Sequence, residues 1–434
     1  MSTAAHRCVI DALSGAAAPA PAPPRSNPWL VLALLLGISI ISYADRYLIA
    51  GLVGPIKAEF GVGDGYIGLL MGPAFAVLFT TMSIPIARAA DRVSRVAIIA
   101  IGCLVWSVFT TLSGFATGPV TMAVARIGVG IGEAAFLAPA YSLLAAYFPP
   151  ARRGLAFAVL GLGIYFGQII GFAAGPAVAA QWDWHAAFYV LGAPGIIIAL
   201  VAWAVIAEPA RAIVVAPPLP LLPLGRRLAA ARGYRLAVLG MGFGTLSGVS
   251  FGRWGPALFA RAYGLPAQEA NTTFGLAFGL PGLLGTLMFG ALADRLLKRS
   301  PQGPMLLAAG ALLTATLCIF AVNWSPNFGL ARALAIPSGL LGGGWSIGVM
   351  ASLQNMLPDR FRATATALFI MISTFIGFVM GPWAAGTISE AVGGDSALSL
   401  RIGLSVTILT GVPAAIMLWR SAHHLDADRQ ALAG

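Results

Sequence analysis

Four charged residues stand inside long apolar stretches of the sequence, where an ionised side chain is costly. Arg126 and Glu133 lie in the apolar segment 119–148, and Asp45 and Arg46 lie in an earlier one. Each such charge costs about 2.5–3.5 kcal/mol in hydrocarbon even on lenient scales, so these residues usually face a bundle interior or a wet cavity. Because Arg126 and Glu133 are seven residues apart, a helix places them on one face about 10 Å apart along its axis. Such a group could exchange protons or hold an anion; the alternative is a buried structural ion pair.

The composition places these charges in a membrane protein. The chain has 434 residues, of which 59% are apolar and 9% charged. A soluble domain carries about 25% charged residues, so the sequence predicts an all-α polytopic membrane protein. The net charge of +11 does not indicate a nucleic-acid partner, because the basic residues fall in particular loops. The 3 cysteines and 4 histidines show no metal or disulfide spacing, so we expect no metal and no cofactor.

Twelve apolar segments are each long enough to cross about 30 Å of hydrocarbon at about 1.5 Å per residue. Their approximate limits are 28–57, 65–88, 96–116, 119–148, 154–180, 186–207, 234–262, 271–293, 303–323, 328–356, 362–389 and 400–419. A Pro/Ala-rich stretch precedes them, and a Pro/Arg-rich stretch separates the sixth from the seventh. The expected domains are a disordered tail (1–27), a six-helix bundle (28–207), a linker (208–233), a second six-helix bundle (234–420) and a second tail (421–434).

The distribution of lysine and arginine predicts the orientation. One set of loops carries most of the basic residues, and both termini and the linker fall on that side. The opposite loops hold little beyond Lys57, Arg261 and Arg401. The positive-inside rule therefore predicts that both termini and the linker are cytoplasmic. The high Ala, Gly and Arg content with short loops favours a bacterial inner membrane.

Motifs of the first half recur in the second. An Ala-Asp-Arg run follows the second segment and again the eighth, and a Gly-x-x-x-Gly-Pro run lies in the fifth and again in the eleventh. The matching residues are Asp91 and Arg92 with Asp294 and Arg295, and Gly171, Gly175 and Pro176 with Gly377, Gly381 and Pro382. A nearly constant offset of about 200 residues predicts parallel six-helix repeats. Parallel repeats around a site at the midplane are a transporter architecture.

These motifs resemble those of the major facilitator superfamily over nearly the whole chain. The run from Gly290 to Arg299 is similar to the cytoplasmic loop motif of that superfamily, and its first-half copy retains Asp91, Arg92 and Arg95. The resemblance implies twelve helices in two bundles. If these charges pair only when the cytoplasmic side is closed, they form a latch; the alternative is plain topogenic charge. The predicted latch residues are Asp91, Arg92, Arg95, Asp294 and Arg295.

The fourth segment carries a second part of this resemblance. Arg126 with Gly130 and Gly132 is similar to the fourth-helix motif of the superfamily, which is linked to proton coupling. The Gly-x-x-x-Gly-Pro runs are similar to its fifth-helix motif. Small residues four apart let helices approach closely, and proline bends them. We therefore expect a packing role for Gly130, Gly132, Gly171, Gly175, Pro176, Gly377, Gly381 and Pro382.

Two stretches narrow the resemblance to the spinster branch. They are the run from Tyr43 to Gly51, followed by Phe60, and the run from Gly130 through Glu133. Spinster proteins transport lysolipids and sphingolipid phosphates. The resemblance thus implies a proton-coupled transporter of an amphipathic anionic lipid, with an alternating-access mechanism. Its expected partners are a lipid or amphipathic small molecule, protons and membrane lipids, and we expect a monomer.

A proton-exchange hypothesis follows for the first and fourth helices. A carboxylate beside an arginine stays ionised, whereas one in an apolar setting binds a proton more readily. Protonation of Asp45 or Glu133 would release an arginine, and we expect these two acids to carry protons with Arg126 as switching partner. A static lattice of salt bridges is the alternative. The expected substrate contacts are Arg46, Tyr43, Arg253, Trp254, Tyr165 and Gln168.

Other functions compete with this one. A multidrug or small-metabolite exporter of the same superfamily fits the composition equally well. A membrane-embedded enzyme is disfavoured, because the sequence holds no catalytic-triad spacing, nucleophile elbow or metal cluster. The sequence contains no Walker A motif, so direct use of ATP is disfavoured. A channel or scaffold differs from a transporter in lacking concentrative uptake.

Overall fold

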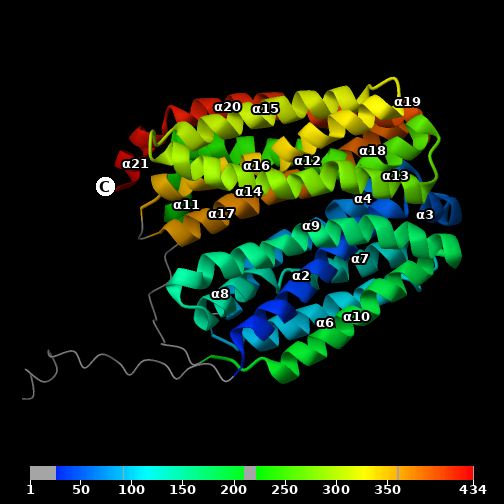
Figure 1. Ribbon diagram of the computed structural model, residues 1–434, viewed down its shortest axis with the longest axis horizontal. Helices are drawn as coiled ribbons and strands as arrows, with labels where there is room; N and C mark the ends of the chain where they lie inside the picture. Colours follow the sequence, from blue (N-terminus) through cyan, green and yellow to red (C-terminus); the bar gives the residue numbers. More distant parts are fainter. Residues whose placement is uncertain (1–25, 91, 210–220, 359–360, 434) are drawn as a thin grey trace, which may run out of the picture.

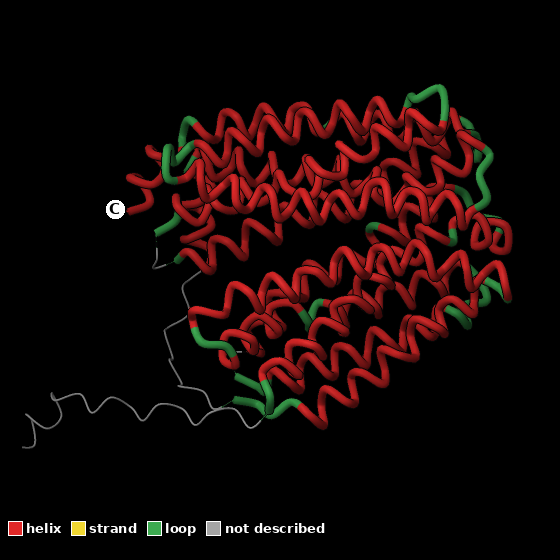
Figure 2. The backbone as a smooth tube through the Cα atoms, viewed as in Figure 1, coloured by secondary structure: helices red, strands yellow, loops and turns green. Residues whose placement is uncertain are grey.

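The computed structural model describes residues 26–90, 92–209, 221–358 and 361–433. Residues 1–25 of the predicted tail and the predicted latch residue Asp91 lie outside this part of the chain. All of the secondary structure in the described part is helical (Figure 2). Labels follow Figure 1.

The first half of the chain folds into six helical crossings. Two of them, the second and the fourth, are each built from two consecutive helices. The elements are α2 (Pro28–Gly51), α3 (Val53–Phe60), α4 (Asp64–Met71), α5 (Pro73–Ala90), α6 (Arg95–Ser113), α7 (Pro119–Glu133), α8 (Leu137–Tyr147), α9 (Pro150–Gln181) and α10 (Trp184–Val205).

The second half repeats this arrangement. Its second and fifth crossings each contain a short π-helix, and two further helices flank the bundle. The elements are α11 (Leu221–Ala230), α12 (Arg232–Tyr263), α13 (Ala267–Phe274), η1 (Gly275–Gly279), α14 (Leu280–Leu297), α15 (Gly303–Asn323), α16 (Phe328–Met356), α17 (Arg362–Thr374), η2 (Phe375–Met380), α18 (Gly381–Val392), α19 (Ala397–Leu409), α20 (Gly411–Ala422) and α21 (Leu425–Ala433).

The twelve predicted crossings are confirmed. Eleven helical segments of the described chain are long and apolar enough to span a membrane. The twelfth crossing is α12, which has 32 residues and lies within the second bundle (Figure 1). It is less apolar than the others because it carries several glycines and four arginines, Arg232, Arg235, Arg253 and Arg261. Three of these arginines lie near the two ends of the helix, which leaves Arg253 as the buried charge in its middle.

The two halves meet at one end of the molecule and separate at the other. Figure 1 shows α11, α21 and the C-terminus at one end, called here the linker side, and α3, α13 and α19 at the opposite side. On the opposite side a single apolar cluster joins both halves, with residues such as Leu70 and Phe172 beside Phe274 and Ala385. Toward the linker side there are two clusters, one centred in each half. The bundles therefore hold together on the opposite side and diverge toward the linker side.

Four of the predicted packing glycines, Gly130, Gly132, Gly171 and Gly381, lie where the main chain of a neighbouring helix approaches, whereas Gly175 and Gly377 lie against the side chains of Leu48 and Thr245. A Cβ on Gly171 would press on the main chain of Ala44, and one on Gly381 would press on the main chain of Leu246. These positions bring α9 onto α2 and α18 onto α12. The carbonyl of Phe75 occupies the corresponding space at Gly130 and brings α7 onto α5. The contact at Gly130 also holds Phe75 of α5 beside α7, where its ring lies 5.2 Å from the Arg46 guanidinium and 5.7 Å from that of Arg126.

Candidate functional site

Two ion pairs cross between α2 and α7 in the centre of the first half. Arg126 donates from Nη1 to Asp45 Oδ2 at 2.8 Å, and Arg46 donates from Nε to Glu133 Oε2 at 2.5 Å. Thr110 on α6 donates to the other oxygen of Asp45 at 2.9 Å. The side chains of all four charged residues are at most 8% exposed. We call Asp45, Arg46, Arg126 and Glu133 the central cluster.

The pairing follows from helix geometry on both sides. Asp45 and Arg46 are adjacent and about 100° apart around α2. Their side chains therefore point in different directions and meet different residues of α7. Arg126 and Glu133 are about two turns apart on α7 and take one partner each. The two α7 residues therefore do not pair with each other. Arg46, expected from the sequence to contact substrate, is the partner of Glu133.

Aromatic rings enclose the Arg46 guanidinium. Its Cζ lies 4.4 Å from the ring centre of Phe79, 4.7 Å from that of Tyr43 and 5.2 Å from that of Phe75. Cation–π contacts of this kind contribute about 0.5–2 kcal/mol each, with the larger values away from water. They give the cation a second set of favourable contacts that does not depend on Glu133. Arg46 can therefore lose its carboxylate partner without becoming an isolated buried charge.

The central cluster has unused hydrogen-bonding capacity. Within the described chain, Glu133 Oε1 and Arg126 Nε are buried atoms with no hydrogen-bond partner. A buried polar atom left without a partner costs about 1–3 kcal/mol, so native structures retain few of them unless they have a use. A bare carboxylate oxygen is a place for a proton, and a bare guanidinium nitrogen is a donor for an incoming anion.

Arg253 reaches the cluster from the second half. It is 3% exposed on α12 and donates to the main-chain oxygen of Arg46. Its guanidinium lies 4.7 Å from the ring centre of Tyr47. No ion pair of Arg253 occurs among the described residues. With Arg253 included, three arginines face two carboxylates, so the fully ionised group has one excess positive charge.

The other expected substrate contacts lie at the interface between the halves or inside one half. Tyr165 on α9 hydrogen-bonds to Thr286 on α14, and Gln168 packs against Gly279 in η1. Both therefore stand where the halves meet. Trp254 is fully buried and donates from Nε1 to the carbonyl of Pro382 at 2.9 Å. Its polar atom is already used to dock α12 on α18.

A second charged group, centred on Asp64, was not expected from the sequence. Asp64 begins α4 and is fully buried. It accepts from Nη1 and Nη2 of Arg261 on α12, both at 2.7 Å, from Lys57 Nζ at 2.5 Å and from Ser389 Oγ on α18 at 2.8 Å. Arg261 and Ser389 belong to the other half. This carboxylate therefore joins four helices, α3, α4, α12 and α18, on the opposite side.

Two more contacts extend this group, which we call the Asp64 network. Lys57 also pairs with Asp395, whose side chain is 75% exposed, and Glu390 accepts from the N–H of Gly65 at 2.7 Å. The sequence signal was the occurrence of Lys57 and Arg261 in otherwise charge-poor loops. It could have prompted a search for acidic partners at the same membrane level.

The predicted latch residues that the structure describes, Arg92, Arg95, Asp294 and Arg295, are on the linker side, and the structure does not bring the two copies together. Arg95 donates from Nε to Glu208 at 2.8 Å and from Nη1 to the carbonyl of Ser142 at 3.1 Å, all within the first half. Asp294 and Arg295 are exposed at the end of α14. Among the described residues, neither of them forms an ion pair.

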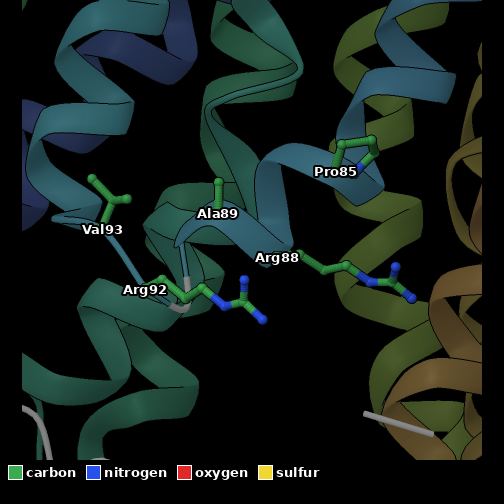
Figure 3. Close-up of a pocket in the computed structure, with 5 residues that line it drawn as sticks. All are labelled: Pro85, Arg88, Ala89, Arg92 and Val93. Carbon is green, nitrogen blue, oxygen red and sulfur yellow. The ribbon is translucent and has the colours of Figure 1, made fainter.

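The arginines at the linker end of α5 are also unengaged by the second half. Figure 3 shows Arg88 and Arg92 extending in the same direction, and both are exposed. With Pro85, Ala89 and Val93 they line an open pocket on that surface. Cationic side chains thus face the gap between the diverging bundles.

Sequence and structure comparisons place this geometry among known proteins. The profile of the Major Facilitator Superfamily matches residues 35–382. An MFS-type efflux pump of Mycolicibacterium smegmatis is 30% identical over 409 residues, covering 92% of this chain and 94% of the relative. Human protein spinster homolog 1 is 27% identical, covering 92% of this chain and 82% of the relative.

Solved structures give the same fold. A bacterial homolog of the human lysosomal transporter Spinster, in an inward-facing and unoccupied conformation, superimposes with a TM-score of 0.82 at 24% identity. The match covers 92% of this chain and 98% of that one. The nucleoside transporter NupG gives a TM-score of 0.71 at 13% identity, covering 90% of this chain and 98% of that one. The two superpositions therefore show the same overall fold.

Proposed function

Since the chain belongs to the Major Facilitator Superfamily and is a spinster-like transporter rather than an enzyme, we propose that it moves an amphipathic anionic lipid by proton-coupled alternating access. The lipid is of the lysophospholipid or sphingolipid-phosphate type. Asp45 and Glu133 carry the protons, and the arginines of the central cluster bind in turn to these carboxylates and to the headgroup.

The observation that carries the proposal is the pair of crossed ion pairs with a bare oxygen on Glu133. A proton arriving at Glu133 weakens its bond to Arg46, and the rings of Tyr43, Phe75 and Phe79 hold the freed guanidinium. A proton arriving at Asp45 frees Arg126 in the same way. Each protonation therefore converts a paired arginine into a donor for an anion, which links proton binding to substrate binding.

The excess positive charge supports an anionic substrate. Arg253 stands beside Arg46 and has no carboxylate of its own among the described residues. A phosphate-bearing headgroup would neutralise it, and bidentate contact with a guanidinium is a strong form of phosphate recognition. Tyr43, Tyr165 and Gln168 complete the proposed contacts. The similarity to protein spinster homolog 1 supports the lipid class.

The orientation completes the mechanism. We propose that the linker side is cytoplasmic, with both termini there, and that the membrane is a bacterial inner membrane. The bundles of residues 28–207 and 234–420 then rock about the central cluster as one monomer, with residues 208–233 as linker. The divergence toward the linker side corresponds to an inward-open state. Closure brings Arg92 and Arg95 toward the Asp294 and Arg295 copy of the latch.

Reconstitution tests this proposal directly. The purified chain in proteoliposomes is given a panel of lysophospholipids and sphingosine phosphates, with and without an inside-alkaline pH gradient. We expect gradient-dependent uptake that falls at least about tenfold in Asp45→Asn and in Glu133→Gln. Glu269→Gln is the matched control, because this exposed carboxylate is on α13 in the other half and forms no ion pair within the described residues. Full coupled transport by both variants would refute the role of the two acids.

A drug or metabolite exporter is the second candidate, and the efflux pump of M. smegmatis favours it. The same proteoliposomes are loaded with cationic dyes in place of lysolipids. Proton-driven movement of the dyes without movement of any lysolipid supports the exporter. Equilibration without concentration would instead indicate a channel.

A further inference from the structure

A groove on the linker side joins three segments that the transport mechanism does not use. It lies between α11, the first turn of α12 and the C-terminal helix α21, and it encloses about 470 Å³. Its lining residues include Arg227, Arg232, His424 and Asp428. We propose that this groove binds the headgroup of an anionic phospholipid from the adjacent leaflet, such as phosphatidylglycerol.

Charge complementarity is the first argument. Residues 221–235 contain four arginines, Arg226, Arg227, Arg232 and Arg235, and no acidic residue. All four are exposed, and the described residues provide none of them with an ion pair. Two of these arginines, Arg227 and Arg232, line the groove. A concave site with two unpaired guanidinium groups favours a phosphate, which each can bind through two N–H donors.

The one acidic residue of the groove is already engaged. Asp428 is 6% exposed, and its Oδ2 accepts from the main-chain N–H of Tyr234 at 3.0 Å. It therefore caps the start of α12, and within the described residues it forms no ion pair with an arginine. Ser421 adds a bond to the carbonyl of Gly233 at 2.8 Å. The C-terminal segment is thus fixed against α12, which gives the groove a firm wall.

The position in the membrane identifies the anion as a lipid. The helix α11 buries Leu224 and Leu228 in the apolar cluster of the second half and exposes Arg226 and Arg227. An amphipathic helix with arginines on its polar face lies at the level of the headgroups. The groove is at the first turn of α12, on the side that the proposed orientation makes cytoplasmic. Basic pockets at this level, on the side facing anionic lipid, are sites for phospholipid headgroups.

The exposed face of α12 supplies a path for an acyl chain. Arg232, Arg235 and Leu239 follow one another at helical spacing, and all three are exposed. The first two are at the groove end and Leu239 is one turn further into the crossing. A bound lipid would place its phosphate beside the arginines and its chains along the apolar continuation of the same face. A free phosphate ion would contact only the arginines at the groove end of this face and not Leu239.

Lipid titration of the purified full-length chain tests the proposal. Native mass spectrometry in neutral detergent gives apparent affinities for dioleoyl-phosphatidylglycerol, for dioleoyl-phosphatidylcholine and for inorganic phosphate. We expect binding of phosphatidylglycerol to weaken about fivefold in Arg227→Gln and in Arg232→Gln, and about 25-fold in the double variant. Both residues are exposed, so their replacement leaves the fold intact.

The matched control is Arg226→Gln. This arginine is on the same helix and equally exposed, but it does not line the groove. Unchanged affinity in Arg226→Gln beside weakened affinity in the other two supports a defined site. Equal weakening in all three variants would show a diffuse basic surface and overturn the proposal. Binding of phosphatidylcholine as tight as phosphatidylglycerol, or competition by millimolar inorganic phosphate, would overturn the assignment to an anionic lipid.

Discussion

The central cluster and the Asp64 network both bury carboxylates beside cations, yet they connect different parts of the molecule. The central cluster pairs α2 with α7, inside one bundle. The Asp64 network pairs α4 with α12 and α18, across the two bundles. Rigid-body rocking leaves bonds inside one bundle intact and breaks bonds between bundles. The first group is therefore suited to proton and substrate binding, and the second to holding one conformation.

Arg253 links substrate binding at the central cluster to the docking of the two bundles. It belongs to the second half but bonds to the main chain of Arg46 in the central cluster. A ligand that takes over Arg253 removes one link between the bundles at the midplane. Substrate binding at the cluster would then lower the cost of separating the halves, which is how a ligand shifts a conformational equilibrium.

The largest expected effect is a loss of thermal stability in Arg126→Leu. This substitution leaves the Asp45 carboxylate buried with Thr110 as its remaining partner, and an uncompensated buried charge costs about 3–5 kcal/mol. We expect a large loss of thermal stability in detergent, most of it restored in the double variant Asp45→Asn/Arg126→Leu. The distance between spin labels on the opposite side, at Phe115→Cys and Leu398→Cys, should not change. An altered distance would contradict the assignment of this pair to one bundle.

The second effect concerns conformation rather than stability. Arg261→Gln removes the two strongest bonds of Asp64 to the second half. We expect a shift of the equilibrium toward separation on the opposite side by about 1–3 kcal/mol, or about 5- to 150-fold. Double electron–electron resonance between the labels at Phe115 and Leu398, which are 65% and 58% exposed, should show a new longer distance.

The control for this experiment is Arg332→Gln. Arg332 is also on the second half, but it is exposed, its guanidinium lies 6.0 Å from the ring centre of Phe328 on its own helix, and it forms no ion pair within the described part of the chain. It should leave the distance distribution unchanged. If Arg261→Gln and Arg332→Gln behave alike, the Asp64 network does not hold the halves together.

The contrast also shows what the sequence could and could not predict. Hydropathy predicted the twelve crossings, and eleven of them are long and apolar enough in the described chain to span a membrane. Position alone predicted that Asp45, Arg126 and Glu133 lie in the membrane. The sequence could not choose the pairing, since two carboxylates and two arginines can combine in more than one way. Only the rotation of α2 against α7 decides that Glu133 takes Arg46.

The Asp64 network was missed for a different reason. Its members come from distant parts of the chain and meet only when the bundles are docked, so no local pattern marks them. The opposite holds for the motif from Gly290 to Arg299. It could be identified from the sequence, but the partners of its charged residues depend on the conformation. In the structure Asp294 and Arg295 stand exposed. Motifs report which residues are available, whereas the docked arrangement of helices decides which are in use.

A smaller effect is expected from Glu208→Gln, which tests a charged contact outside the membrane. Partial burial raises the pKa of Glu208, but the N–H of Val96 and the side chains of Arg95 and Ser94 outweigh it and hold the pKa below the ordinary 4.5. Its stabilisation is therefore complete above about pH 4.5 and is lost as the pH falls through the lower, folded-state value. Because the side chain is 27% exposed, we expect a contribution of about 1 kcal/mol.

The measurement is the midpoint of thermal unfolding between pH 3 and pH 7 (about the range in which a carboxyl titrates). The wild type should lose stability below about pH 4.5 more steeply than Glu208→Gln. The label distance on the opposite side should be the same in both, because this contact lies within the first half. Identical pH profiles would mean that water replaces the contact at no cost.

The smallest effect is expected from Asp395→Asn, at the exposed edge of the Asp64 network. Lys57 keeps its bond to the buried Asp64 when Asp395 is neutralised, and the Asp395 side chain is 75% exposed. Exposed ion pairs contribute about 0–1 kcal/mol, so the distance between the labels should shift by less than in Arg261→Gln. Raising the salt concentration should remove what effect remains, whereas the effect of Arg261→Gln should persist. A shift as large as that of Arg261→Gln would mean that the exposed pair, and not the buried carboxylate, holds the two bundles together.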